Sequence, residues 1–503
     1  MGNNSIIKNS ILLYSRMFIS MIVSFYTTRV VLSVLGVEDY GLRNVVAGFA
    51  SMFTYFNGVL QAGTSRFIAL YLGSGNYDKL KKCFSNAIII HICIALFILV
   101  LAESFGIWFV NSELNIDPTR YYAANWVFQL SIVGCIISVI QTPYVAITTA
   151  YEKFNIYAYL SIFDVILKLV IVYLITTIKG DKLIIYSFLL LCTQIITFLL
   201  YFIITKKSFK ECSGKIITDK KMIKEMLTFS GWTATGNLSV ILSNQGLNVI
   251  MNIFYGTIVN AAKGLADTIT WLVKSFASSV ITATVPRMTK LYGDNKLEEL
   301  KKLVMDSSQI CVFFITIFAL PVILEIDTFM NIWLTEVPEY TTIFIKIVLI
   351  NSIYTFPTTT LEQCINAIGK VKKATIYLSP VYLSYFPIAY IIMHKGGTPV
   401  MVYSCLFLIS TMALITQLYI LRNSINFNVM KYLIKIPITS ILVFAISYGI
   451  CYSIQNMIQP SLMRLIIICS ISMFLYTILY LYIVLSKENR QKIAHTIKRK
   501  LHI

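Results

Sequence analysis

The sequence predicts an all-α integral membrane protein with about fourteen transmembrane helices. Its mean hydropathy is +0.75, and 57% of its 503 residues are hydrophobic while 13% are charged. Apolar runs of about 18 residues or more recur along the whole chain, which is the length that crosses a bilayer as a helix. No long stretch alternates with period two, so soluble β-rich classes are excluded. The net charge of +19 does not indicate nucleic-acid binding, because Lys and Arg lie in short loops between the apolar runs.

The apolar runs define the predicted elements in chain order. We expect spans at 10–35, 41–72, 83–108, 120–149, 155–178, 183–205, 227–255, 257–290, 303–325, 340–368, 374–394, 399–421, 433–456 and 461–485. The first run holds Arg16 and Arg29 and is followed by no small-residue cleavage site. We therefore expect a retained first helix and not a signal peptide.

Loop charge predicts the orientation of these spans. The connections after odd-numbered spans carry acids such as Glu38, Asp39, Glu113 and Asp117, whereas those after even-numbered spans are rich in Lys. Basic loops face the cytoplasm, so both termini are expected there. The predicted parts are an N-terminal lobe (1–205), a basic cytoplasmic linker (206–226), a C-terminal lobe (227–421), a last pair of spans (433–485) and a basic cytoplasmic tail (486–503).

The two lobes contain similar segments in the same order. Arg66–Gly73 followed by Lys81 and Lys82 resembles Arg287–Gly293 followed by Lys301 and Lys302. Tyr71 matches Tyr292, 221 residues later, whereas the lysines match at 220, which requires one inserted residue. Further echoes pair Ile107-Trp108 with Ile332-Trp333, and Ala150–Lys153 with Ala367–Lys370. The sequence therefore predicts a duplicated six-helix unit with parallel copies and a substrate site between the lobes.

Ionisable residues inside the apolar spans indicate where that site lies. At about 100° per residue, Lys263, Asp267 and Lys274 are offset by roughly 40° and 20°, so they share one helix face. An ionised group at the centre of a membrane helix costs at least about 2.5–3.5 kcal/mol, so this face should line a protein interior or a wet cavity. With the cations of the first two spans, the predicted substrate-binding cavity contains Arg16, Arg29, Arg43, Lys263 and Lys274. Such a cavity favours an anion, phosphate above all.

Polar residues accompany these charges. Asn237, Asn244, Asn248 and Asn252 form one helical stripe, and Asn57 and Gln61 are four residues apart. They either make interhelical hydrogen bonds or line a hydrated lumen. Together with Asp267 they are candidates for polar contacts or ion coupling, and coupling to H⁺ or Na⁺ is left open. Asp164 and Lys168, at i and i+4, are interpreted first as a structural ion pair.

The sequence contains no motif for catalysis or metal binding. We find no P-loop, no nucleophile motif and no large outer loop that would hold acid and base residues. The four histidines and ten cysteines have no ligand spacing, so neither a metal nor a cofactor is expected. Binding and translocation are therefore predicted, and no enzyme activity.

The chain resembles the polysaccharide flippases of the multidrug/oligosaccharidyl-lipid/polysaccharide exporter superfamily, which move O-antigen and capsule repeat units. The resemblance rests on the predicted spans and on the segments Val34–Gly41, Arg66–Gly73 and Ala150–Phe154. It implies a two-lobe transporter of the bacterial inner membrane that works by alternating access on undecaprenyl-diphosphate-linked glycans. The implied partners are this lipid-linked glycan, membrane lipid and other polysaccharide assembly proteins.

The resemblance also implies a role for particular helices. Relatives hold the diphosphate in a cationic cavity built from the first, second and eighth helices, which here carry Arg16, Arg29, Lys263 and Lys274. The last two helices are implied to form a groove for the lipid tail. Two alternatives remain open: a drug or organic-cation exporter of the same superfamily, which would need an acidic lumen, and a membrane polysaccharide polymerase, which would need a larger outer loop.

Overall fold

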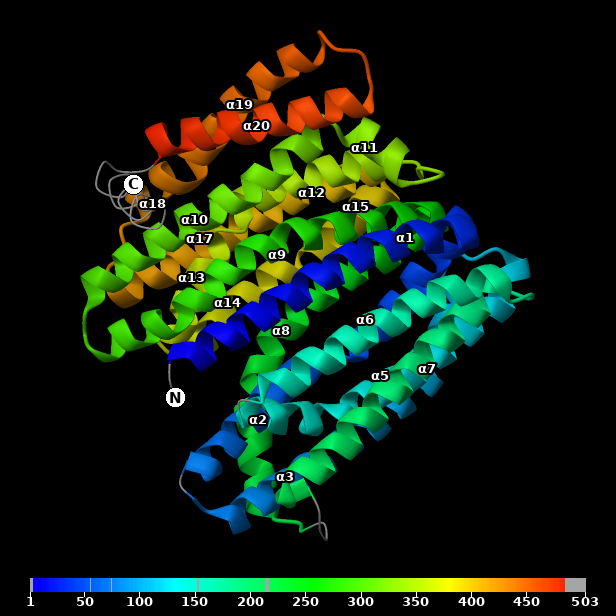
Figure 1. The fold of residues 1–503 in the computed structure, drawn as a ribbon, viewed down its shortest axis with the longest axis vertical. Coiled ribbons are helices and arrows are strands. Elements are labelled where there is room, and N and C mark those ends of the chain that lie inside the picture. The colour runs from blue at the N-terminus through cyan, green and yellow to red at the C-terminus, as the bar shows by residue number, and fades with distance from the viewer. Residues whose placement is uncertain (1–2, 55, 74, 152, 213–216, 485–503) are drawn as a thin grey trace. The chain divides into compact units, whose positions relative to one another are not determined.

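The computed structural model of the protein describes residues 3–54, 56–73, 75–151, 153–212 and 217–484 (Figure 1). Helices and short connections account for this part of the chain, and it contains no strand. The all-α class is therefore confirmed. The predicted basic tail (486–503) lies outside the described residues, as do Glu152 and residues 213–216 of the predicted linker.

Many of the described helices can cross a membrane. Ten are long and apolar enough, and an eleventh span is obtained if Thr341–Thr355 and Thr358–Ala367, which meet at 45°, count together. The helices α8 (Lys220–Tyr255) and α9 (Thr257–Gly293) are longer still, but they carry the Asn and Lys residues discussed above and are not among the ten. The chain is thus a multi-pass membrane protein, and the number fourteen stays a prediction.

The first of two compact units comprises Met1–Gly264 and Ala389–Met393. Its central helix α5 packs against α1, α2, α3 and α7, because apolar residues cover it on several sides. Buried Ile68, Leu80, Phe84, Tyr144 and Ile147 form part of one core of this unit. The helices of the unit up to the start of α8 are α1 (Asn3–Thr54), α2 (Phe56–Gly73), α3 (Tyr77–Leu101), the π-helix η1 (Ala102–Gly106), α4 (Ile107–Ser112), η2 (Pro118–Arg120), α5 (Tyr121–Ala150), α6 (Phe154–Thr177), α7 (Lys182–Ser208) and η3 (Lys210–Cys212).

Gly36 separates the first two predicted spans within α1. Its backbone angles, φ 78° and ψ 172°, are not helical, and glycine adopts them without a steric penalty. The predicted loop from Gly36 to Tyr40 is therefore a kink at one residue, and the helix resumes at once. Asp39, Gly41 and Arg43 consequently lie on a helix and not on a loop.

The second unit comprises Leu265–Ile388 and His394–Ile503. One buried cluster extends from Met288 on α9 through Leu300 and Leu320 to Tyr432 and Tyr476. The last helices are therefore part of the core of this unit. Its elements after α9 are α10 (Leu297–Leu324), α11 (Ile326–Trp333), α12 (Thr341–Thr355), α13 (Thr358–Ala367), α14 (Val371–Leu383), α15 (Tyr385–His394), α16 (Pro399–Ser404), α17 (Leu406–Ile425), α18 (Val429–Leu433), the π-helix η4 (Ile434–Ile438), α19 (Thr439–Gln455) and α20 (Leu462–Ile483).

The turns at the ends of α2 and α9 have the same hydrogen bonds. Asn76 N–H donates to Tyr71 O at 3.1 Å, and Lys296 N–H donates to Leu291 O at 2.9 Å. Gly75 and Asn295 both have positive φ, 67° and 58°. All these pairs are 220 residues apart, so Tyr71 corresponds to Leu291. The predicted match to Tyr292, with its inserted residue, is corrected.

A second pair of equivalent turns follows α5 and α13. Lys153 N–H donates to Thr148 O at 2.9 Å, and Lys370 N–H donates to Ile365 O at 3.0 Å. The two turns lie 217 residues apart, so three residues fewer separate them than separate the first pair. The duplicated segments thus share local backbone structure and not only residue type.

Candidate functional site

The charged face of α9 is the first part of the candidate site. Lys263 is only 5% exposed, Lys274 is half-buried and Asp267 is exposed. Asp267 is near enough for its charge to act on Lys274. Since α9 runs without a break from Thr257 to Gly293, the three residues share one helix as predicted. Gly264, beside Lys263, is the last residue of the first unit before the chain passes into the second.

The predicted cations of α1 lie at different depths of burial. Arg29 is exposed, while Arg43 is half-buried and lies seven residues beyond the kink at Gly36. Arg16 on α1 and Asn237 on α8 are predicted site residues whose side chains lie outside the described part of the structure. A common site formed by Arg16, Arg29, Arg43, Lys263 and Lys274 stays a prediction.

Asparagines of α1, α8 and α9 form a buried cluster in the first unit. Asn260 Nδ2 donates to Asn248 Oδ1 at 2.8 Å, and Asn252 Nδ2 donates to Asn260 Oδ1 at 2.9 Å. Asn44 Nδ2 donates to Asn260 O at 2.8 Å, and Asn115 N–H donates to Asn252 Oδ1 at 2.9 Å. Asn248 and Asn252 are 1% and 0% exposed. In this structure they follow the interhelical alternative and not the hydrated-lumen one.

The other predicted polar residues are less enclosed. Asn244 is exposed, and its amide donates to Val240 O of its own helix at 3.1 Å. Asn57 Nδ2 donates to Ser138 Oγ on α5 at 2.8 Å, and Gln61 is half-buried on α2. A role of these residues in ion coupling stays a prediction.

Small residues let the asparagine cluster form. A Cβ built on Gly264 would lie 1.8 Å from Asn44 Nδ2, and one on Gly41 would lie 1.9 Å from Thr257 O. Both distances are far below van der Waals contact, so only glycine fits. The close approach of α1 to the start of α9 thus depends on two glycines that the sequence analysis did not single out.

Arg43 lies inside the first unit together with the Asp164–Lys168 ion pair. Lys168 Nζ is 2.7 Å from Asp164 Oδ2, as the i, i+4 spacing predicted. These three residues line one cavity of about 460 Å³, whose walls are formed by α1, α5, α6 and α7. The Arg43 guanidinium lies 4.8 Å from the centre of the Tyr186 ring. Arg43 is therefore not a residue that extends from a helix end to the lipid headgroups.

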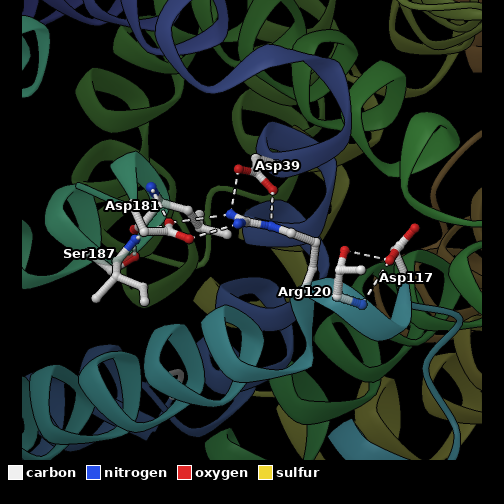
Figure 2. A network of polar contacts seen from close by, with 8 residues as sticks. Asp39, Asp117, Arg120, Asp181 and Ser187 are labelled. Atoms are coloured by element: carbon white, nitrogen blue, oxygen red, sulfur yellow. Dashed lines mark hydrogen bonds and ion pairs between the residues drawn. The ribbon is translucent and has the colours of Figure 1, made fainter. Parts of the chain in front are cut away.

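A second arginine centre was missed by the sequence analysis. Figure 2 shows Arg120 between two carboxylates, with Nε 2.8 Å from Asp39 Oδ1 and Nη1 2.7 Å from Asp181 Oδ2. This Arg120 cluster (Asp39, Arg120 and Asp181) ties α1, η2 and the N-terminus of α7 together. The available signal was the position of Arg120 at the start of a span that follows an acidic loop, where the positive-inside rule expects few cations.

The carboxylates around Arg120 are held in their charged form. Burial raises the pKa of Asp181, but hydrogen bonds from Arg120 and from the amides of Ile184 and Leu183 outweigh it and lower the pKa below its ordinary value. Hydrogen bonds from the Thr119 hydroxyl and amide lower the pKa of Asp117. Because these acids are bound by donors of the protein itself, the Arg120 cluster is a structural centre and not a ligand site.

Comparisons with known proteins agree with this class of structure. A family model described as polysaccharide biosynthesis protein matches residues 6–292. The lipid II flippase MurJ in an inward closed conformation has a TM-score of 0.67 at 16% identity, covering 98% of this chain and 100% of that one. Among curated proteins, none matches the sequence significantly.

Two other solved structures belong to transporters of the MOP superfamily. An inward-facing multidrug resistance MATE family transporter has a TM-score of 0.64 at 15% identity, covering 80% of this chain and 96% of that one. A MOP superfamily transporter from Pyrococcus furiosus has a TM-score of 0.58 at 16% identity, covering 82% and 94%. The fold of this chain is thus that of the MOP-type transporters and flippases.

Proposed function

The chain belongs to the polysaccharide biosynthesis protein family, and from this premise we propose that it is a flippase for polyprenyl-diphosphate-linked oligosaccharides. It would act in the bacterial inner membrane by alternating access, with both termini in the cytoplasm. The cargo is a lipid-linked glycan, whose polyprenyl tail stays in the lipid while the glycan crosses. No covalent chemistry is part of this function.

The burial of Lys263 on α9 carries the proposal. A Lys side chain that is 5% exposed in a membrane protein is costly unless it meets an opposite charge during the working cycle. Lys274 follows on the same face, and Asp267 is the one acid that this face carries between them. An excess of cations on one intramembrane face suits a diphosphate, which is a compact polyanion. Arg16 and Arg29 are proposed to add to this charge.

The structural relatives favour a flippase over a drug exporter. The lipid II flippase covers 98% of this chain, whereas the multidrug transporter covers 80%. An exporter of cationic drugs would also need acids where this chain has Lys263 and Lys274. The drug exporter is therefore the outcome to look for if the flippase test fails.

The lipids of a deletion strain test the proposal. We expect polyprenyl-diphosphate-linked repeat units to accumulate on the cytoplasmic leaflet and surface glycan to be lost. Restoration of both by the wild-type gene is the positive control. Normal surface glycan without any trapped intermediate in a strain that has no second flippase gene would contradict the proposal, and drug resistance on overexpression would favour the exporter.

Single substitutions then test the cationic residues. Lys274→Ala and Arg29→Ala should each abolish complementation while the protein still reaches the membrane in normal amount. Lys346→Ala is the matched control, since Lys346 forms an exposed ion pair with Asp327 at 3.6 Å and has no proposed role. Full complementation by both Lys274→Ala and Arg29→Ala would contradict the assignment of these cations.

A further inference from the structure

The cavity inside the first unit has no role in the function proposed above. We call it the polar chamber; it has a volume of about 460 Å³ and lies among α1, α5, α6 and α7. Arg43, Gln141, Asp164, Lys168, Thr193 and Gln194 supply much of its polar lining. A smaller hollow of about 170 Å³ shares Arg43 and Gln194 with it. The volume of the chamber is within the range of small-molecule sites, about 300–1,000 Å³.

The polar chamber is deep in the membrane-spanning part of the unit. Asp164 is ten residues from the start of α6 at Phe154 and thirteen from its end at Thr177. At about 1.5 Å per residue, it is roughly 15–20 Å from either end of a helix that crosses a hydrocarbon core about 30 Å thick. Ionisable groups at this depth are costly, and they are retained where they bind or conduct something. The chamber is therefore a candidate site and not a packing defect.

The charges of the polar chamber leave one cation in excess. Asp164 and Lys168 neutralise each other at 2.7 Å, so Arg43 is the surplus charge. The face of its guanidinium lies over Tyr186, and the described residues provide no hydrogen-bond acceptor for its N–H groups. Arg120 shows the contrast, because two carboxylates occupy its N–H groups. The N–H edge of Arg43 is thus open to an acceptor from outside the protein.

The surplus of a single guanidinium selects the ligand. A diphosphate carries more negative charge than one cation can balance, whereas a carboxylate carries one charge and matches the two-pronged geometry of arginine. The amides of Gln141 and Gln194 and the hydroxyl of Thr193 add donors and acceptors of the kind that bind sugar hydroxyls. The tyrosine ring under Arg43 fixes the orientation of the fork.

We propose that the polar chamber binds the carboxylate of an acidic sugar, such as a uronic acid. In combination with the proposed flippase function, on which only the source of the sugar rests, this names carboxylated glycans as the cargo class. Exposed Gln194 and Lys168 place the mouth of the chamber at α6 and α7. A free carboxylate ion shares the chemistry, and the experiment separates the two.

Ligand binding to the full-length protein in lipid nanodiscs tests the proposal. Saturation-transfer NMR titrations compare methyl glucuronide, methyl glucoside and acetate. We expect methyl glucuronide to bind at least tenfold more tightly than methyl glucoside, because only the former carries the carboxylate. We also expect it to bind at least tenfold more tightly than acetate, because the amides and hydroxyls contact the sugar. Equal binding of acetate and glucuronide would assign the chamber to a free anion and overturn the sugar site.

Variants locate the site within the protein. Arg43→Gln should weaken glucuronide binding at least tenfold, and Arg43→Lys should weaken it less because the charge remains. Gln194→Leu, at the exposed mouth, should weaken binding severalfold without disturbing the fold, so the test stands even if Arg43→Gln is unstable. Lys346→Gln is the control and should bind as the wild type does. Unchanged binding in both Arg43→Gln and Gln194→Leu would contradict the proposal.

The outcome is independent of the flippase test. Binding is measured without transport, so a deletion strain that accumulates no lipid intermediate would refute the proposed function and leave the sugar site intact. Conversely, accumulation of a lipid-linked glycan that has no carboxylate would uphold the flippase and overturn the acidic-sugar cargo.

Discussion

At the scale of the single residue, Asp181 stabilises the fold through its charge. Its pKa in the folded protein is below the ordinary value of 3.8, so the stabilisation is present above that value and is lost as the pH falls through the folded pKa. Asp181→Asn keeps an oxygen that can accept from the amides of Leu183 and Ile184 but removes the charge bound by Arg120. We expect it to lower stability at pH 7 by about 1–3 kcal/mol.

Thermal unfolding of the purified protein across pH checks this expectation. The difference between wild type and Asp181→Asn should shrink as the pH is lowered below 3.8, because the wild-type carboxylate then takes up a proton. A difference that stays constant between pH 7 and about pH 3 would show that the charge of Asp181 is not what matters.

Two glycines test the packing that holds the asparagine cluster. Gly264→Ala meets only the end of the Asn44 side chain, whereas Gly41→Ala meets the backbone of Thr257, which cannot move aside. Gly41→Ala should therefore be the more destabilising, by about 1–3 kcal/mol or more. Adding Asn44→Ala should rescue part of the loss in Gly264→Ala and none in Gly41→Ala.

Apparent melting temperatures of these variants decide the matter. Gly449→Ala on α19 is the control, since nothing lies within 4 Å of its added Cβ and alanine favours a helix. Equal effects of Gly41→Ala and Gly264→Ala, with rescue of both or of neither by Asn44→Ala, would contradict the geometry described here.

Sequence reasoning reached some of these residues and missed others for a physical reason. The Asp164–Lys168 pair was predicted because its partners are one helical turn apart. Arg120 was missed because its partners Asp39 and Asp181 are 81 and 61 residues away along the chain. Local spacing contains no information about such pairs. Arg43 was assigned to a cationic site from its span, but only the packing of four helices shows the chamber that it lines.

At the scale of the element, the turn after α9 tests the duplication. Asn295 has φ 58°, and its counterpart Gly75 has φ 67°. Only glycine adopts such angles freely, and asparagine adopts them better than alanine does. Asn295→Ala should therefore cost about 1 kcal/mol, and Asn295→Gly should be close to neutral.

Gly75→Ala provides the matched comparison in the first copy. Nothing lies within 4 Å of an added Cβ at Gly75, so the cost of that substitution is backbone strain alone. Melting temperatures should place Gly75→Ala and Asn295→Ala at similar losses. A stable Asn295→Ala protein beside a destabilised Gly75→Ala protein would show that the two turns are not equivalent.

A buried ion pair attaches α20 to the second unit. Arg464 Nη2 lies 3.0 Å from Glu325 Oε2, and the two side chains are 12% and 1% exposed. Removing one partner leaves an uncompensated buried charge, so Arg464→Gln should destabilise by about 3–5 kcal/mol. Glu325→Gln with Arg464→Gln should cost less than the two single losses together. Additive losses in this double-mutant cycle would show that the pair is not coupled.

Helix positions were predictable where the membrane itself sets the length. The span expected at 155–178 corresponds to α6 at Phe154–Thr177, and that expected at 183–205 lies within α7 at Lys182–Ser208. Apolar runs of fixed length leave few alternatives. The break between the first two spans was placed in a loop of several residues, because the sequence shows acids there but not that Gly36 alone makes the turn.

At the scale of the whole molecule, the loop charges predict which loops face the cytoplasm. Glu113 lies in an acid-bearing connection and Lys220 at the start of α8 follows a basic one; both side chains are exposed. By the positive-inside rule, Glu113 should face the outside of the inner membrane and Lys220 the cytoplasm. Glu113→Cys should then react with an impermeant maleimide in cells whose outer barrier has been opened, and Lys220→Cys only after the inner membrane is opened.

The native cysteines allow this measurement to be controlled. Cys212, near Lys220 in the chain, is half-buried, and burial together with the charge of Glu211 raises its pKa to about 12. The thiolate is the reactive form, so Cys212 should label slowly at neutral pH and contribute little background. The parent protein without added cysteine measures what remains. Because the number of spans between the two positions decides their sides, labelling of both from the same side would overturn the predicted topology and, with it, cytoplasmic termini for the proposed flippase.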